Sequence, residues 1–200
     1  MLNKPALPLN NTDYIKDLQQ RIELYEDMKA YRELYDMLFH SLHRFSWSFV
    51  KSKEVAEEIV SDVFIKVWQI RSKITEIKNL KEYLYIITKN FSLNYITRNY
   101  KNTTVSLDEI DFEPAVNLGT PEDLSITVDI IRQVHNAVAQ LSPRCRIIFQ
   151  LVKEDNLSYK EVAAILNLSV FTVRNQLSIA VQKLSDALPK YLQHTYLVAR

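Results

Sequence analysis

The sequence predicts an all-α protein with two small helical domains joined by an acidic linker. Glycine occurs once in 200 residues, far below its usual share of about 7%, and sheets rely on glycine in their tight turns and bulges. Apolar residues recur at helical spacing through most of the chain. The formal charges almost cancel, to net +1, yet they are sorted into separate blocks. Together these features favour helices in two units over a sheet.

Charge divides the chain into four blocks. Residues 1–65 carry net −3 and residues 66–102 net +6, residues 103–129 contain seven acidic groups and no basic one, and residues 130–200 carry net +5. The acidic block also holds the single glycine and two prolines, which interrupt helices. We therefore expect an N-terminal extension over 1–25, helical domains over 26–102 and 126–190, and a linker over 103–125. The linker is either a solvated spacer or a segment that occupies a basic channel otherwise used by nucleic acid.

The N-terminal domain is predicted to contain three helices. The first covers "YRELYDMLFHSLHRFSWSFV", the second runs over about 53–70 and the third over about 79–101. Their apolar stripes include Leu34, Leu38, Leu42 and Phe45, then Ile59, Val63 and Val67, then Leu80, Leu84 and Phe91. Each stripe indicates a helix with one face in a core.

The C-terminal domain is predicted to contain four helices, at about 127–140, 144–153, 158–166 and 170–188. The last two form a hairpin, in which Ser158 and Ser169 are placed to cap helices and Asn167 suits a left-handed turn. The inward residues are expected to be Val162, Ala163 and Leu166, followed by Val170, Val173 and Leu177. The outward residues of the second helix are types that reach base edges and phosphates: Phe171, Thr172, Arg174, Asn175 and Ser178. This spacing predicts a helix-turn-helix, although any helical hairpin shares it.

Two other stretches carry binding chemistry. Glu54, Glu58 and Asp62 recur every four residues on one helix face, which indicates either a solvated acidic surface or a docking site. Residues 83–101 combine basic and aromatic side chains, a combination that suits single-stranded DNA because bases stack on rings. The candidates for contacting DNA there are Lys89, Asn90, Asn94 and Arg98, whereas Tyr85 and Phe91 are expected in the core.

Three stretches resemble parts of one known family. They are "LSPRCRIIFQLVKEDNLSYKEVAAILNLSVFTVRNQLSIAVQKLSDAL", "AEEIVSDVFIKVW" and "YLYIITKNFSLNYITR". The first is similar to the C-terminal domain of the extracytoplasmic-function sigma factors of bacterial RNA polymerase, within the sigma-70 family. The second resembles that family's polymerase-docking helix, and the third resembles its promoter-melting segment. The hairpin departs from the family's usual pattern at Asn167, Phe171, Arg174 and Gln176, which leaves open the DNA sequence that it reads.

The resemblance implies a role for each domain. The N-terminal domain would bind the clamp of core polymerase through Glu58, Asp62 and Phe64, the last two matching a family "D-x-F" pattern. It would also hold the melted minus-ten strand, with Asn90 near the pocket for an extruded base. The C-terminal domain would contact the flap and read the minus-thirty-five element, so the partners are core RNA polymerase and promoter DNA. An anti-sigma factor is the family's usual regulator, and no residue here identifies one.

Other functions find less support in the sequence. An autonomous helix-turn-helix regulator and a helical interaction protein that binds no DNA remain alternatives. His40 and His43 are three residues apart, but no further ligand in the sequence supports a metal site. The sequence contains no cofactor-binding or catalytic motif, so we expect that the protein is not an enzyme and needs no cofactor. One cysteine excludes an internal disulfide, which fits a reducing cytosol, and no apolar run has membrane-spanning length. We expect a cytoplasmic protein without membrane insertion.

Overall fold

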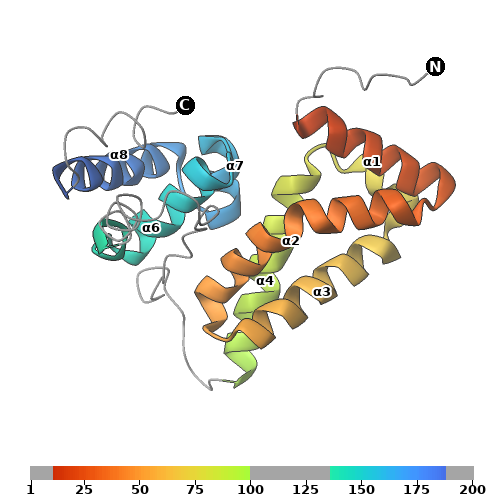
Figure 1. Cartoon of the computed structure of the whole chain (residues 1–200), viewed down its shortest axis with the longest axis horizontal. Helices are drawn as coiled ribbons and strands as arrows, with labels where there is room; N and C mark the ends of the chain where they lie inside the picture. Colours follow the sequence, from red (N-terminus) through yellow and green to blue (C-terminus); the bar gives the residue numbers. More distant parts are fainter. Residues whose placement is uncertain (1–10, 100–135, 188–200) are drawn as a thin grey trace, which may run out of the picture.

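The structure is a computed structural model that describes residues 11–99 and 136–187. Every element labelled in these ranges is helical (Figure 1). They are α1 (Asn11–Tyr25), α2 (Met28–Val50), α3 (Lys53–Gln69), η1 (Arg71–Glu76), α4 (Leu80–Asn99), α6 (Pro143–Phe149), η2 (Gln150–Glu154), α7 (Tyr159–Leu166) and α8 (Val170–Ala187). The all-α prediction is confirmed, and the acidic linker lies outside the described residues.

The N-terminal domain is built around the packing of α2, α3 and α4. Asp27 caps α2 by accepting hydrogen bonds from the backbone N–H groups of Lys29 and Ala30, and Ser52 caps α3 in the same way at Val55. The core contains the predicted stripes, including Leu34, Leu42 and Phe45 from α2 and Ile59, Val63 and Val67 from α3. On α4 the most buried face is partly polar, because Ser92 pairs with Ser46 through their hydroxyl oxygens at 3.0 Å. This pair supplements the predicted apolar stripe, of which Leu80 and Leu84 are buried, and apolar periodicity could not predict it.

Helix α1 is part of the N-terminal domain, which differs from the extension expected over residues 1–25. It packs against η1 and α2, and it buries Ile15, Leu18 and Ile22. The buried Gln19 amide also donates hydrogen bonds to the carbonyl oxygens of Ile74 and Ile77, at 2.6 and 3.0 Å. These contacts anchor the irregular segment between α3 and α4, which periodicity alone did not predict.

The C-terminal domain contains α6, η2, α7 and α8. The helix expected over 144–153 is two elements, because the α-helix gives way to a π-helical turn at Gln150. The side chains of α6 and α8 pack on each other around Cys145, Ala180 and Leu184. This packing sets the position of α8.

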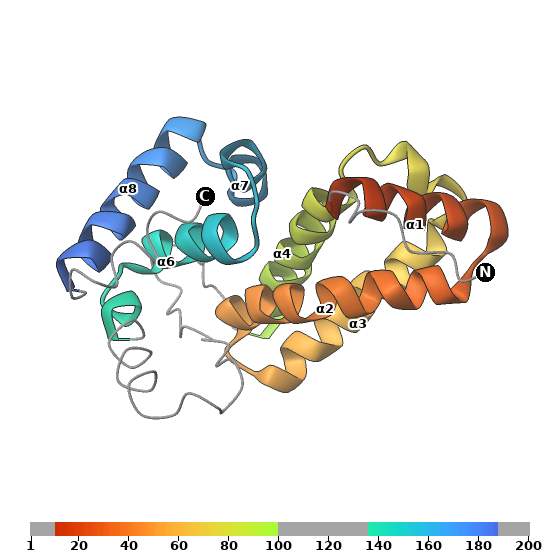
Figure 2. The same cartoon turned by 45° about the horizontal axis from the view of Figure 1, so that its top comes forward.

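The two domains are in contact. In both views α4 of the N-terminal domain faces α7 of the C-terminal domain (Figures 1 and 2). One apolar cluster includes Leu84 and Ile96 of α4 together with Val162 and Leu166 of α7. The described residues therefore form two domains that share a core across their seam.

Taken singly, no helix of the described ranges has both the length and the hydropathy of a membrane span. Helices α7 and α8 reach those values only as a pair, and that pair bends by 107° at its break. Much of its apolar surface is buried in the protein, as at Val162, Leu166 and Val173.

Candidate nucleic-acid interface

An open groove between α3 and α4 brings two predicted sets of residues together. Its volume is about 480 Å³, and its walls include Glu58 and Asp62 from α3 and Asn94 and Arg98 from α4. All four side chains are exposed. The residues predicted to dock on polymerase therefore lie across one groove from two of those predicted to hold the melted strand.

Phe64 does not belong to this exposed surface, and its role in docking stays a prediction. Its side chain is only 2% exposed. The ring packs against Tyr35, with 4.7 Å between centroids, and the Phe64 carbonyl accepts a hydrogen bond from the Tyr31 hydroxyl at 2.8 Å. The aromatic member of the "D-x-F" pattern therefore supports α3 from inside, while Asp62 faces solvent.

Lys89 and Asn90 are neighbours on α4 with different surroundings. Asn90 is exposed. The Lys89 side chain reaches across the seam, where its Nζ donates a hydrogen bond to the carbonyl oxygen of Ile165 on α7. Burial of the ammonium lowers the pKa of Lys89. In this arrangement Lys89 is therefore bound to the C-terminal domain and is not presented with Asn90, Asn94 and Arg98.

The helix-turn-helix has the local features that the sequence predicts. Ser158 and Glu161 form a reciprocal capping box at the start of α7, and the Ser169 hydroxyl accepts a hydrogen bond from the Thr172 N–H at 2.9 Å. Asn167 ends α7 in the left-handed conformation, with φ 56° and ψ 50°. The bend of 107° between α7 and α8 lies in the range typical of this motif. Helices α7 and α8 therefore have the geometry expected of the predicted hairpin.

The outward face of α8 carries most of the predicted base-reading residues. Phe171, Arg174, Asn175 and Ser178 are exposed, while Val173 and Leu177 are buried beneath them. Thr172 is only partly exposed, and its hydroxyl lies 2.8 Å from that of Ser169 within the helix cap. Val170 is exposed, which corrects the expectation that it is inward. The side chains available to a ligand on this face are thus those of Phe171, Arg174, Asn175 and Ser178.

Charged side chains cross the seam between the domains. Arg44 of α2 donates to Asp155 at 2.5 Å and lies 3.5 Å from Glu154. Lys81 of α4 donates through its Nζ to the Asp155 carbonyl oxygen. Asp155 follows η2, so one short segment of the C-terminal domain binds two cations of the N-terminal domain.

Burial changes the pKa values of the seam groups. It raises the pKa of the Asp155 carboxyl, and the nearby Arg44 guanidinium opposes this increase. It lowers the pKa of Lys81, which the carboxylates of Asp155 and Glu161 oppose. Burial is the main cause that holds the pKa of the Tyr85 hydroxyl well above its usual value, and the negative charge of Asp155 is the second cause. The seam thus contains charges whose mutual attraction offsets only part of the cost of removing them from water.

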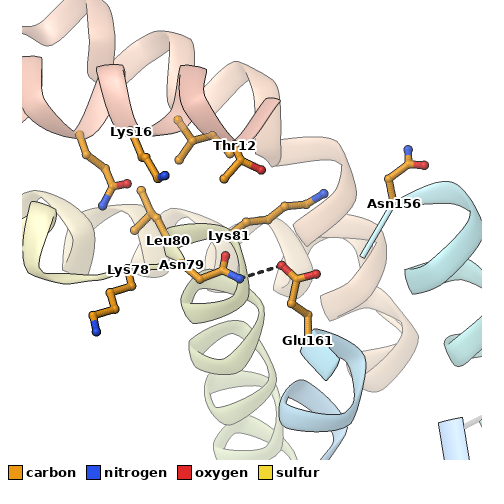
Figure 3. Close-up of a pocket in the computed structure, with 10 residues that line it drawn as sticks. Thr12, Lys16, Lys78, Asn79, Leu80, Lys81, Asn156 and Glu161 are labelled. Carbon is orange, nitrogen blue, oxygen red and sulfur yellow. Dashed lines mark hydrogen bonds between the residues drawn. The ribbon is translucent and has the colours of Figure 1, made fainter. Parts of the chain in front are cut away.

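A cavity of about 210 Å³ lies beside this seam, with walls from both domains. Figure 3 shows Lys16 of α1 and Lys81 of α4 on one side, and Asn156 and Glu161 of the C-terminal domain on the other. Asn79 donates a hydrogen bond to Glu161 at 2.7 Å and also caps α4 by accepting the Glu82 N–H. Sequence analysis missed these seam residues, because contacts between positions some 80 or 110 residues apart leave no local pattern.

Family models match both domains. The model for sigma-70 region 2 matches residues 30–102, and that for sigma-70 region 4 matches residues 131–184. These ranges contain the groove of α3 and α4 and the helix-turn-helix of α7 and α8. A region 2 domain followed by a region 4 domain defines the class as a sigma factor.

Curated relatives with similar sequences come from one group of sigma factors. The chain is 26% identical over 154 residues to the ECF RNA polymerase sigma factor SigM of Bacillus subtilis, covering 76% of this chain and 91% of that protein. It is 26% identical over 158 residues to the ECF RNA polymerase sigma-E factor of Escherichia coli K12, covering 76% and 82%. By its region 2 and region 4 domains the chain belongs to the sigma-70 family, and it is similar to members of the extracytoplasmic-function group of that family.

Solved structures show a similar fold. CnrH in complex with the cytosolic domain of CnrY has a TM-score of 0.55 and 18% identity, covering 87% of this chain and 96% of that one. The sigma factor RpoE of Bartonella quintana, in complex with the anti-sigma factor NepR, has a TM-score of 0.54 and 19% identity, covering 80% and 97%. At these identities the likeness concerns the fold alone.

Proposed function

We propose that this chain is the promoter-specificity subunit of a bacterial RNA polymerase, which binds the core enzyme and directs transcription initiation to particular promoters. The observation that carries this proposal is the presence of sigma-70 regions 2 and 4, in that order, on the two described domains. The polymerase would supply the chemistry of RNA synthesis. The chain would supply recognition of the promoter and would catalyse no reaction itself.

The groove between α3 and α4 suits two ligands at once. We assign its acidic wall, Glu58 and Asp62, to the polymerase clamp, and Asn90, Asn94 and Arg98 to the melted minus-ten strand. Exposed amides can pair with unstacked bases, and an exposed guanidinium can bind a phosphate or stack on a base. Lys89 can join this strand-binding set only after its hydrogen bond to Ile165 breaks, so we assign it to DNA in a form in which α4 and α7 have separated.

The C-terminal domain suits double-stranded DNA. The helix α8 presents Arg174 and Asn175 in its first two turns, where the second helix of this motif meets base edges in the major groove. We assign this face to the minus-thirty-five element. The same domain would contact the polymerase flap.

An anti-sigma factor is the proposed regulator. Of the similar solved structures, RpoE is bound to the anti-sigma factor NepR and CnrH to the cytosolic domain of CnrY. A protein that recognises both domains of this chain would control its access to polymerase.

Mobility-shift assays with and without core polymerase test the proposed function. We expect a promoter fragment to be shifted by the chain plus core enzyme and not by the chain alone. Specific binding without polymerase would instead identify an autonomous regulator. The absence of DNA binding under both conditions would identify a helical interaction protein.

Charge reversal at the groove tests the docking assignment. Asp62→Lys should weaken binding to core polymerase without lowering the melting temperature, because Asp62 is exposed and surface changes have little effect on stability. Asp36→Lys, an equally drastic change at an exposed carboxylate of α2, is the matched control and should leave core binding unchanged. Equal core affinity of Asp62→Lys and the unmodified protein would contradict the assignment.

A further inference from the structure

Phe171 is a large apolar side chain that the fold leaves in water. It is the second residue of α8 and is 70% exposed, the largest exposed fraction among the large hydrophobic residues of the described part of the C-terminal domain. The residues of α8 that belong to the core are Val173 and Leu177, which are buried although Phe171 is exposed. The ring therefore does not serve the packing of this domain.

The turn that carries Phe171 is held in place. The Ser169 hydroxyl accepts the Thr172 N–H at 2.9 Å and lies 2.8 Å from the Thr172 hydroxyl. These bonds fix the backbone on both sides of position 171 and pair the hydroxyls of Ser169 and Thr172 with each other. Phe171 is consequently presented from a rigid helix start, which favours recognition of one group in one place.

The neighbours of the ring on the helix surface are polar. Arg174 and Asn175 follow at three and four residues, the spacing that places side chains next to each other on a helix, and both are exposed. The only carboxylate of α8 is Asp186, in its last turn. A lone ring between a guanidinium and an amide suits an anionic polar surface with one apolar spot better than an apolar protein groove.

DNA offers such a surface. At base edges in the major groove, arginine pairs with guanine and asparagine with adenine, while the apolar group is the C5-methyl of thymine. An aromatic ring that meets any other edge group or a phosphate would remove a polar group from water without forming a hydrogen bond with it. The C5-methyl is thus the match for Phe171.

We infer that Phe171 is a specificity-determining residue that reads a thymine of the upstream promoter element through its C5-methyl group, next to purines read by Arg174 and Asn175. This inference rests on the proposed function, because it requires α8 to lie in the major groove of that element. It adds the identity of a base and the chemical group that is recognised.

Replacing thymine by uracil tests the inference, since this change removes the methyl group and nothing else. An upstream element is first selected from a randomised library by transcription with core polymerase and the full chain. Each thymine of that element is then replaced in turn by uracil. We expect initiation to fall about fourfold at one position, which corresponds to one buried methyl group. The Phe171→Ala variant should initiate equally well from the thymine and uracil templates at that position.

Ile179→Ala provides the matched control. Ile179 is also an exposed apolar residue of α8, at 43%, but it lies two turns beyond Phe171. This variant should keep the full sensitivity to uracil. Unchanged melting temperatures of both variants would show that the helix is intact.

Each other outcome is decisive. Selective initiation with no effect of uracil at any position would overturn the inference and leave the proposed function standing. Uracil sensitivity that persists in Phe171→Ala would also overturn it, because another side chain would then read the methyl group. Loss of core binding in Phe171→Ala, measured without promoter DNA, would assign the ring to a protein contact instead. Failure of the unmodified chain to direct initiation from any template would refute the proposed function itself.

Discussion

Substituting Asp155 by alanine perturbs the seam between the domains at its most buried charge. The Asp155 side chain is 2% exposed, and its partner Arg44 is 18% exposed, with 2.5 Å between the bonded atoms. After the substitution, Arg44 keeps only Glu154, which lies 3.5 Å away and is itself 38% exposed. The change therefore leaves a cation largely buried with a weaker partner.

The structure allows the size of this effect to be worked out. Removing one partner from a buried ion pair costs about 3–5 kcal/mol, much of it from the charge that is left uncompensated. Glu154 and the residual exposure of Arg44 reduce that cost, so we expect a loss near the low end, about 3 kcal/mol. The hydrogen bond from Lys81 should survive, because it is accepted by the backbone carbonyl of Asp155 and not by its side chain.

Urea unfolding of the full chain measures the effect, and a double-mutant cycle assigns it to the pair. Arg44→Ala and Asp155→Ala should each destabilise the protein, and the double variant should lose less than the sum of the two. The matched control is Asp186→Ala, which removes an exposed carboxylate of α8 and should change stability by less than about 0.5 kcal/mol. The combination Arg44→Met with Asp155→Leu should recover most of the loss, since apolar residues of similar size need no desolvation of charge. Strict additivity of the two alanine substitutions would refute the reasoning.

Three further effects are expected. Ser158→Ala should cost about 1 kcal/mol by removing the cap of α7, and thermal unfolding should show it; an unchanged melting temperature would mean that the capping box contributes nothing. Asn167→Gly should leave the free energy of unfolding nearly unchanged, whereas Asn167→Val should lower it by about 1–2 kcal/mol, because a β-branched residue is strained at the positive φ of this position. Equal stability of the two variants would contradict this. The raised pKa of Asp155 means that the folded state binds a proton more tightly than the unfolded state. Its contribution to stability is therefore greatest below the unfolded pKa and is lost as the pH rises through the folded pKa, so urea midpoints measured against pH should show a fall that Asp155→Asn lacks.

Features encoded by neighbouring residues could be predicted from the sequence. Ser158, Asn167 and Ser169 act within one or two turns of their own positions, so the turn of the helix-turn-helix followed from residue type and spacing. The buried faces of α2 and α3 followed from periodicity for the same reason. Local chemistry thus defined the hairpin and most of the N-terminal core.

Features that depend on the other domain could not be predicted. Lys89 has the composition of a DNA-binding residue, but its partner is a backbone carbonyl of α7, which no sequence pattern identifies. Phe64 follows an exposed acidic residue by two positions, yet a two-residue step on a helix turns through about 200° and carries it to the buried side. Arg44 and Asp155 lie 111 residues apart, so their pairing depends on how α4 and α7 pack. The assignments of the groove and of α8 to their ligands stay predictions.

The apolar cluster shared by α4 and α7 has a consequence for any form of the protein in which the two domains separate. When the two helices separate, part of the apolar surface around Leu84 and Leu166 must either become exposed to water or be buried against another molecule. DNA phosphates can compete for Lys89, but they offer no apolar cover for the cluster. A protein surface can provide both charge and apolar contact, so it can stabilise the separated form where naked DNA cannot. Polymerase would therefore bind first, and promoter second.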